Sequence, residues 1–286
     1  MTKTIGYLGP KGTYTEEAAQ LYVKQYGGTL KPYPSIREIM DAVNNKEIIE
    51  GVVPIENAIE GSVGTTLDIL AEKNTKLMIK QEIDIHIKHN LLAPSGTKLD
   101  TITDVISHPQ AIAQCQKYLH KHLPKAKHHA ANSTAEAAAT ISGSRWTTSD
   151  TVHFAAIASE MAAKNYHLEI IAKNISDYPD NITRFIVVSK KDHALTHQDK
   201  TSLIFDLKKN EAGALFKILE VFAKDKINLT KIESRPSKTK IGNYIFFVDL
   251  EGHRTEKLIK KVLDNVKKKS SFFKLLGSYP KRVDHD

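Results

Sequence analysis

Residues 80–93, KQEIDIHIKHNLLA, decide the fold of this chain. Isoleucine recurs at positions 83, 85 and 87 between polar residues, and this alternation predicts one long β-like run. Such a run suits a strand that passes from one lobe of a protein to another. A return crossing near residues 155–175 would then place a cleft between the two lobes.

The rest of the first 190 residues alternates short apolar runs with helical patterns. Strands are predicted at Ile5–Leu8 and Gly51–Ile55, and helices follow at about Thr15–Tyr26 and Thr65–Glu72. Capping-box patterns that open further helices begin at Ser35, Ser107 and Ser133. This alternation is typical of an α/β fold with mostly parallel sheets, whose ligands bind outside the carboxyl ends of the strands.

These patterns predict three regions. Residues 1–190 form a two-lobed domain, with the first lobe at about 1–79 and 160–190 and the second at about 80–159. Residues 191–200 are polar and unpatterned, as in a linker. A ferredoxin-like βαββαβ order follows in residues 201–286. Its elements are predicted at Thr201–Leu207, Gly213–Lys224, Leu229–Glu233, Tyr244–Leu250, Thr255–Val266 and Phe273–Leu276.

The composition is that of a soluble globular protein. The chain has 286 residues, of which 41% are hydrophobic and 26% charged. No apolar run approaches the roughly 20 residues that span a bilayer. Cys115 is the only cysteine, so no intrachain disulfide can form, and the first residues lack the apolar core of a signal peptide. We therefore expect a cytoplasmic protein.

The net charge of +8 raises nucleic-acid binding as one alternative. Residues 1–200 carry 22 basic and 22 acidic side chains, whereas residues 201–286 carry 19 and 11. The excess consists mainly of lysines scattered along amphipathic segments, without interleaved aromatic residues on which bases could stack. A solvated basic face is the simpler interpretation.

Residues 178–189, YPDNITRFIVVS, are the most informative stretch for function. A turn-forming Pro-Asp-Asn leads into an apolar run that is predicted to be a strand. Thr183, Arg184 and Phe185 lie where the turn passes into this strand. The threonine hydroxyl can donate a hydrogen bond to a leaving oxygen, and the arginine guanidinium can bind a carboxylate through two parallel hydrogen bonds. The phenylalanine ring can stack against the ring of a substrate. The alternative is an ordinary strand start with an exposed arginine.

Six motifs in the same order along the chain support a functional interpretation. They are YLGPKGTYTEEAA (7–19), VVPIENAIEGSV (52–63), ISHPQAIAQC (106–115), Thr183-Arg184-Phe185, Gly213-Ala214-Leu215 and Glu233-Ser234-Arg235-Pro236. Together they resemble the prephenate dehydratase family with its C-terminal ACT domain. The sequence departs from the family pattern at Ala58, Ile182 and Ala212, and residues 143–153 are longer and more polar than usual.

The resemblance implies a fold like that of type II periplasmic-binding proteins, followed by a regulatory domain. It implies conversion of prephenate to phenylpyruvate with loss of water and carbon dioxide, without metal or organic cofactor. Phenylalanine is the implied effector, and a homodimer or homotetramer the implied assembly. The resemblance also implies that the chain starts at the dehydratase, with no chorismate mutase segment before it.

The resemblance assigns the hydrogen bond to the leaving oxygen to Thr183. Arg184 is then a carboxylate anchor or a scaffold for the loop, and Phe185 a substrate contact or a packing residue. Ser107 either caps a helix or contacts the ligand. The remaining implied substrate contacts are Thr13, Thr15, Asn57, Ser62, Thr65, Gln110 and Gln114. The implied effector contacts are Gly213, Ala214, Leu215, Glu233, Ser234 and Arg235.

Several other functions stay open or are disfavoured. Arogenate dehydratase is the nearest enzyme alternative, since arogenate differs only in an amino group on its side chain. A non-catalytic small-molecule receptor is the alternative from another class. Cys115 lacks a recognisable histidine partner and is expected to be buried. The 13 histidines form no metal-binding motif such as HExxH.

Overall fold

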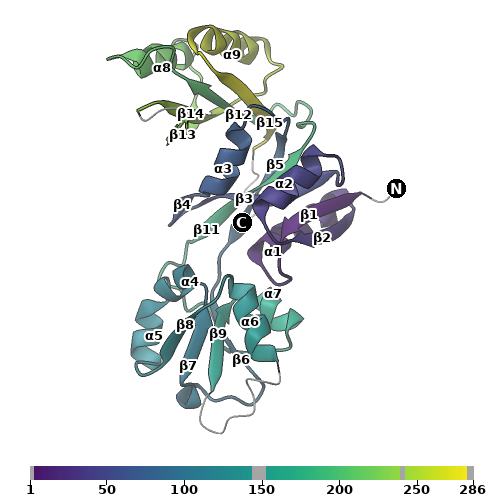
Figure 1. The fold of residues 1–286 in the computed structure, drawn as a ribbon, viewed down its shortest axis with the longest axis vertical. Helices are drawn as coiled ribbons and strands as arrows, with labels where there is room; N and C mark the ends of the chain where they lie inside the picture. The colour runs from purple at the N-terminus through teal and green to yellow at the C-terminus, as the bar shows by residue number, and fades with distance from the viewer. Residues whose placement is uncertain (1–2, 144–152, 239–241, 282–286) are drawn as a thin grey trace. The chain divides into compact units, whose positions relative to one another are not determined.

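The computed structural model describes residues 3–143, 153–238 and 242–281 (Figure 1). The chain divides into two compact units. The first comprises the chain up to Ile39, then Val52–Val63 and Asp84–Phe185; the second comprises Met40–Gly51, Gly64–Ile83 and the chain from Ile186 onward. Most of residues 143–153, whose role the sequence leaves open, lie outside the described part of the chain.

One six-stranded sheet has the order β2-β1-β3-β11-β5, with β4 paired to β3. Its strands are β1 (Thr4–Leu8), β2 (Thr29–Tyr33), β3 (Glu50–Asn57), β4 (Gly61–Ser62), β5 (Met78–His86) and β11 (Ile182–Ser189). Strands β1 and β2 pair in parallel. The accompanying helices are α1 (Tyr14–Tyr26), α2 (Ile36–Asn44) and α3 (Gly64–Ala71).

The bounds of α1 follow from local chemistry. The Thr13 hydroxyl accepts a hydrogen bond from the Glu16 amide, as an N-cap does. Gly27 ends the helix with φ 70°, a conformation that glycine adopts without steric cost, and its amide donates to the Val23 carbonyl at 2.8 Å. The predicted helix of residues 15–26 is confirmed to within one residue.

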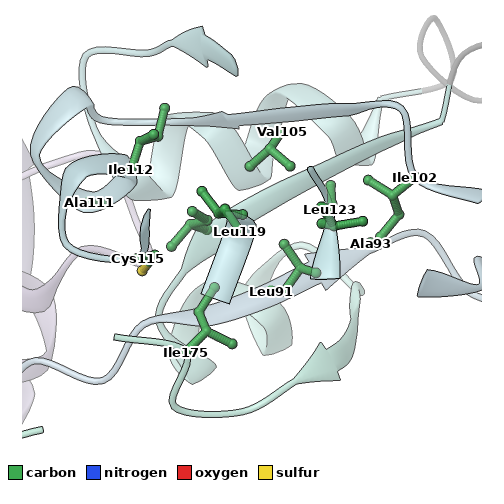
Figure 2. Close-up of a cluster of buried hydrophobic side chains, with 12 residues drawn as sticks. Leu91, Ala93, Ile102, Val105, Ala111, Ile112, Cys115, Leu119, Leu123 and Ile175 are labelled. Atoms are coloured by element: carbon green, nitrogen blue, oxygen red, sulfur yellow. The ribbon is translucent and has the colours of Figure 1, made fainter. Parts of the chain in front are cut away.

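A second, five-stranded sheet has the order β10-β6-β9-β7-β8. Its strands are β6 (Asn90–Ala93), β7 (Asp104–Ser107), β8 (Lys127–Ala130), β9 (Phe154–Ala158) and β10 (Glu169–Ala172). With it are the 3₁₀ helix η1 (Leu99–Thr101) and the α-helices α4 (Pro109–Ala113), α5 (Gln116–His122), α6 (Thr134–Ser142) and α7 (Glu160–Asn165). A buried cluster that includes Leu91, Val105, Cys115 and Leu119 packs within this lobe (Figure 2).

The crossing predicted in residues 80–93 is confirmed, although the single predicted run is divided into two strands with residues 87–89 between them. Strand β5 ends at His86 in the first sheet, and β6 begins at Asn90 in the second. The return crossing comes later than predicted, because β10 still pairs with β6 and only β11 rejoins the first sheet. The estimate that the first lobe resumes at residue 160 is therefore too early. The short, partly exposed β10 carries no pattern that tells which sheet it joins.

Residues after 198 form the predicted βαββαβ arrangement, with sheet order β13-β14-β12-β15. Helices α8 and α9 lie side by side on this sheet (Figure 1). The bounds are β12 (Asp199–Asp206), α8 (Ala214–Lys224), β13 (Leu229–Pro236), β14 (Tyr244–Glu251), α9 (Lys257–Lys269) and β15 (Phe273–Pro280). Strand β12 thus begins inside the predicted linker of residues 191–200.

Two α/β sheets connected by crossing strands, followed by a ferredoxin-like domain, confirm the predicted fold class. Among the described residues, every helix is too short or too polar to cross a membrane.

Candidate active site

A cavity of about 450 Å³ lies within the first unit. Most of its walls follow the carboxyl ends of strands β1, β3, β7 and β8, and the rest come from the two crossings between the sheets. Its lining brings together seven residues predicted from the sequence. They are Thr13, Thr15, Asn57, Ser62, Gln110, Gln114 and Thr183.

The Thr183 hydroxyl is the cavity group that we consider first as a hydrogen-bond donor to a ligand. It lies at the start of β11, and only 9% of it is exposed. The Asn57 amide nitrogen Nδ2 donates to Thr183 Oγ1 at 2.8 Å. The orientation of the Asn57 amide follows from its other end, because Oδ1 accepts from the backbone amides of Ile59 and Glu60, both at 3.0 Å. In this pair the Thr183 oxygen accepts, so its own hydrogen is left to donate.

Arg184 and Phe185 do not line this cavity. Side chains alternate between the two faces of a strand, so Arg184 points away from the face of Thr183. Arg184 Nη1 lies 3.7 Å from Glu56 Oε2, and Phe185 is 2% exposed within the core. The three side chains therefore do not meet at one point. This placement favours the scaffold interpretation for Arg184 and the packing interpretation for Phe185.

Ser107 and Thr65 also lie off the cavity. Ser107 is fully buried, and its hydroxyl donates to the Ile157 carbonyl at 2.7 Å. The prediction that Ser107 caps the next helix is wrong, because the N-cap of α4 is His108, whose Nδ1 accepts from the Gln110 amide. The serine half of the predicted capping boxes is confirmed, because the Ser35 and Ser133 hydroxyls accept from the Glu38 and Glu136 amides. Thr65 is exposed on α3.

Eight polar lining residues were missed from the sequence: Tyr14, Glu60, His89, His108, Asn132, Ser133, Thr134 and Asn181. Asn181 directly precedes Ile182-Thr183, so its place beside the motif was a usable signal. His89 is 3% exposed in the crossing from β5 to β6, and the sequence shows it only as one polar residue in an apolar run. Burial lowers the pKa of His89 and raises that of Tyr14, so both side chains are uncharged near neutral pH.

The described residues that line the cavity include no lysine or arginine. An anion placed here would instead meet helix N-termini, whose first backbone amides lack partners inside the helix. Residues 13–15 supply such a start at α1, and residues 132–134 supply one at α6. The cavity can thus hold carboxylates with dipoles rather than with full positive charges.

Cys115 is buried beside these residues but is not available for chemistry. It is fully buried in the core cluster drawn in Figure 2, and burial raises the pKa of its thiol to about 12. Because the thiolate is the nucleophile, a thiol with this pKa is inert near neutral pH.

We expect iodoacetamide at pH 7.5 to leave Cys115 unmodified in the folded protein and the activity unchanged. Intact-mass spectrometry would show one added carbamidomethyl group only after denaturation. Stoichiometric labelling of the native protein within minutes would contradict the buried, protonated thiol.

The predicted effector residues all lie in the second unit. Gly213 is the N-cap of α8, with φ 78°, and Ala214 and Leu215 follow in the first turn. On β13, Arg235 donates from Nε and Nη2 to Asp68 Oδ1 of α3, at 3.2 and 2.9 Å. Glu233 Oε1 lies 3.7 Å from Arg235 Nη1. Residues 213–215 and 233–235 do not line the 530 Å³ cavity found in this unit.

Comparisons with known proteins agree with this arrangement. Residues 5–193 match the family described as prephenate dehydratase, and residues 201–268 match the ACT domain. The chain is 46% identical over 279 residues to the bifunctional chorismate mutase/prephenate dehydratase of Aquifex aeolicus, covering 98% of this chain and 74% of that protein.

A second relative matches from end to end. The chain is 42% identical over 285 residues to the prephenate dehydratase of Methanocaldococcus jannaschii, covering 98% and 99% of the two chains. Among solved structures, the Arthrobacter aurescens prephenate dehydratase in complex with L-Phe superposes with a TM-score of 0.88 at 34% identity, covering 97% of this chain and 90% of that one. The chain belongs to the prephenate dehydratase family and carries an ACT domain after the dehydratase region.

Proposed function

We propose that the protein converts prephenate to phenylpyruvate, with Thr183 as the hydrogen-bond donor to the leaving hydroxyl group. The observation that carries this proposal is the Asn57–Thr183 contact, which leaves the threonine hydrogen free inside a substrate-sized cavity. Family membership and the two prephenate dehydratase relatives support the reaction.

The reaction needs the protein to hold the substrate in place and to direct one hydrogen-bond donor at the leaving oxygen. The bond between the ring and its carboxylate breaks, and the electron pair enters the ring, which becomes aromatic as hydroxide leaves from the opposite carbon. The dianion thus gives phenylpyruvate, carbon dioxide and hydroxide. Negative charge grows on the leaving oxygen only in the transition state, so a donor placed there lowers the barrier. A threonine hydroxyl does this as a donor, not as a titrating acid.

A lining whose described residues include no lysine or arginine suits this substrate. A cation at the departing ring carboxylate would stabilise the ground state more than the transition state, in which that charge disperses. Asn57, Ser62 and Gln114 offer hydrogen bonds without charge, and Thr13 and Thr15 lie at the start of α1. We assign the substrate contacts to these residues and Gln110, with Arg184 and Phe185 supporting β11 from outside the cavity.

We propose further that phenylalanine regulates the enzyme through the ACT domain. The support is the domain match and the solved relative described in complex with L-Phe. The helix start at Gly213–Leu215 and the strand residues Glu233–Arg235 are the proposed contacts. A homodimer or homotetramer in the cytoplasm is the setting in which we expect this regulation.

The test is phenylpyruvate formation from prephenate and from arogenate, each with and without phenylalanine. We expect turnover of prephenate, suppressed by phenylalanine. Preference for arogenate would keep the mechanism and change the substrate. Binding of prephenate without turnover would overturn the proposal in favour of a receptor.

A further inference from the structure

Four side chains and one backbone amide at the cavity form a closed ring of hydrogen bonds. The Glu60 amide donates to Asn57 Oδ1 at 3.0 Å. Asn57 Nδ2 donates to Asn181 Oδ1 at 2.8 Å, and Asn181 Nδ2 donates to Gln114 Oε1 at 3.0 Å. Gln114 Nε2 then donates to Glu60 Oε1 at 3.1 Å, which closes the ring at the residue where it began.

All four bonds run in the same direction, and the chemistry of Glu60 sets that direction. Its backbone amide can only donate, so it must face the Asn57 oxygen. Its carboxylate oxygen Oε1 accepts from the Gln114 nitrogen Nε2, so the Gln114 oxygen is turned toward Asn181. The three side-chain amides between these ends, of Asn57, Asn181 and Gln114, are oriented accordingly. Reversing any one of them would place two acceptors or two donors against each other.

Two branches connect the ring to its surroundings. Asn57 Nδ2 also contacts Thr183 Oγ1 at 2.8 Å, so the ring delivers a donor to the threonine oxygen. On the other side, His89 Nε2 lies 3.1 Å from Gln114 Oε1. Because Gln114 Oε1 can only accept, His89 Nε2 must carry a hydrogen. His89 Nδ1 lies 3.4 Å from the Tyr14 hydroxyl oxygen, and the Tyr14 hydroxyl donates its one hydrogen to the Lys88 carbonyl at 2.8 Å.

We propose that this ring presets Thr183 as a donor, and that Asn181 and His89 are positioning residues that act on the reaction through Thr183. The inference rests on the proposed function and deepens it. Thr183 could otherwise donate to a neighbouring oxygen and lose the hydrogen that the leaving group needs. Because Asn57 Nδ2 donates to Thr183 Oγ1, the threonine accepts from Asn57 and keeps its hydrogen for the leaving group before substrate binds.

The ring is built from distant parts of the chain, which suits such a role. Asn57 and Glu60 come from β3 and the turn after it, Gln114 from the end of α4, and Asn181 from the return crossing. Asn181 is 1% exposed and Gln114 6%, so water competes little for the bond between these two side chains, whereas Glu60 is exposed. Bonds that run in one direction polarise one another, and shielding strengthens the Asn181–Gln114 bond.

Asn181→Asp is the decisive variant, because it keeps size and shape but replaces the donor to Gln114 by an acceptor. We expect kcat for prephenate to fall about tenfold to a hundredfold, the scale of misplacing a reacting group by about 1 Å, with little change in KM. In a Thr183→Ala background, Asn181→Asp should lower kcat little further, because the Thr183 hydroxyl that Asn181 positions is already absent. If the double variant instead loses the product of the two single-variant factors in kcat, Asn181 has a general structural role and the inference is overturned.

His89 supplies a second, matched test. We expect His89→Leu to lower kcat, and His89→Gln to restore most of it, because the glutamine amide nitrogen can take the place of Nε2. His120→Leu, at an exposed position of α5, serves as the control and should leave kcat unchanged. Equal activity of the leucine and glutamine variants would contradict the role of the Nε2 hydrogen.

The wild-type assay separates the two proposals. If the unmodified enzyme does not turn over prephenate or arogenate, the proposed function fails. If it does, and Thr183→Ala is inactive while Asn181→Asp keeps wild-type kcat, only the inference about the ring fails. Circular dichroism and the thermal midpoint of each variant show whether the fold is intact.

Discussion

Replacing Thr183 by alanine is expected to lower kcat for prephenate by about 10²–10³-fold, the usual cost of removing one transition-state donor. KM should change little, because the hydrogen bond strengthens only as charge develops on the leaving oxygen. The substitution removes one hydroxyl and one methyl group from a residue that is 9% exposed, so the fold should persist. Steady-state kinetics at fixed pH, with phenylpyruvate followed by absorbance, measures the effect.

The matched control is Thr183→Ser, which keeps the hydroxyl and loses only the methyl group. We expect it to retain much more activity than Thr183→Ala, although its freer rotation lowers kcat somewhat. An alanine variant with wild-type kcat would remove Thr183 from the mechanism. A rise in KM with unchanged kcat would make it a substrate-binding residue instead.

Gly277→Ala is expected to destabilise the protein by at least about 3 kcal/mol, more than most single substitutions cost. Gly277 lies in β15 with φ 133°, a conformation that favours glycine. An added Cβ would clash with the Ile79 carbonyl oxygen and lie 3.0 Å from the Ile79 nitrogen. Both are backbone atoms of β5, so no side chain can move aside to relieve the clash.

Gly96→Ala provides the comparison for this second prediction. Gly96 has φ 82°, but an added Cβ would meet no atom within 4 Å. We expect it to cost only about 1–2 kcal/mol, from backbone strain alone. Urea unfolding followed by circular dichroism measures both variants. Equal costs would mean that β15 can move away from β5 without loss of stability.

Much of the fold was predictable because its signals are local. Helix α1 begins at a threonine cap and ends at a glycine, and both are visible in the sequence. The order of strands and helices after residue 198 follows from apolar periodicity. The error at the return crossing has a different origin. Strand β10 pairs with β6, which is far away in the chain, and the four residues of β10 do not reveal which sheet they join.

The candidate site was predictable in part for the same reason. Thr183, Asn57 and Gln114, which were chosen from three separate motifs, line one cavity. The alternation of β11 separates Arg184 from Thr183, which the strand period predicts once the strand start is known. His89 and Asn181 were missed because their burial and their partners depend on how the two sheets meet around the cavity.

The sequence by itself determined the family, the fold class and the hydroxyl at residue 183, because motifs, periods and caps depend on neighbours along the chain. Only the tertiary structure decided which way that hydroxyl can donate. Its direction depends on Asn57, Gln114 and Asn181, which are distant in sequence and whose amides are oriented by a carboxylate and a backbone amide of Glu60. A hydrogen bond has a direction only when both partners are in place.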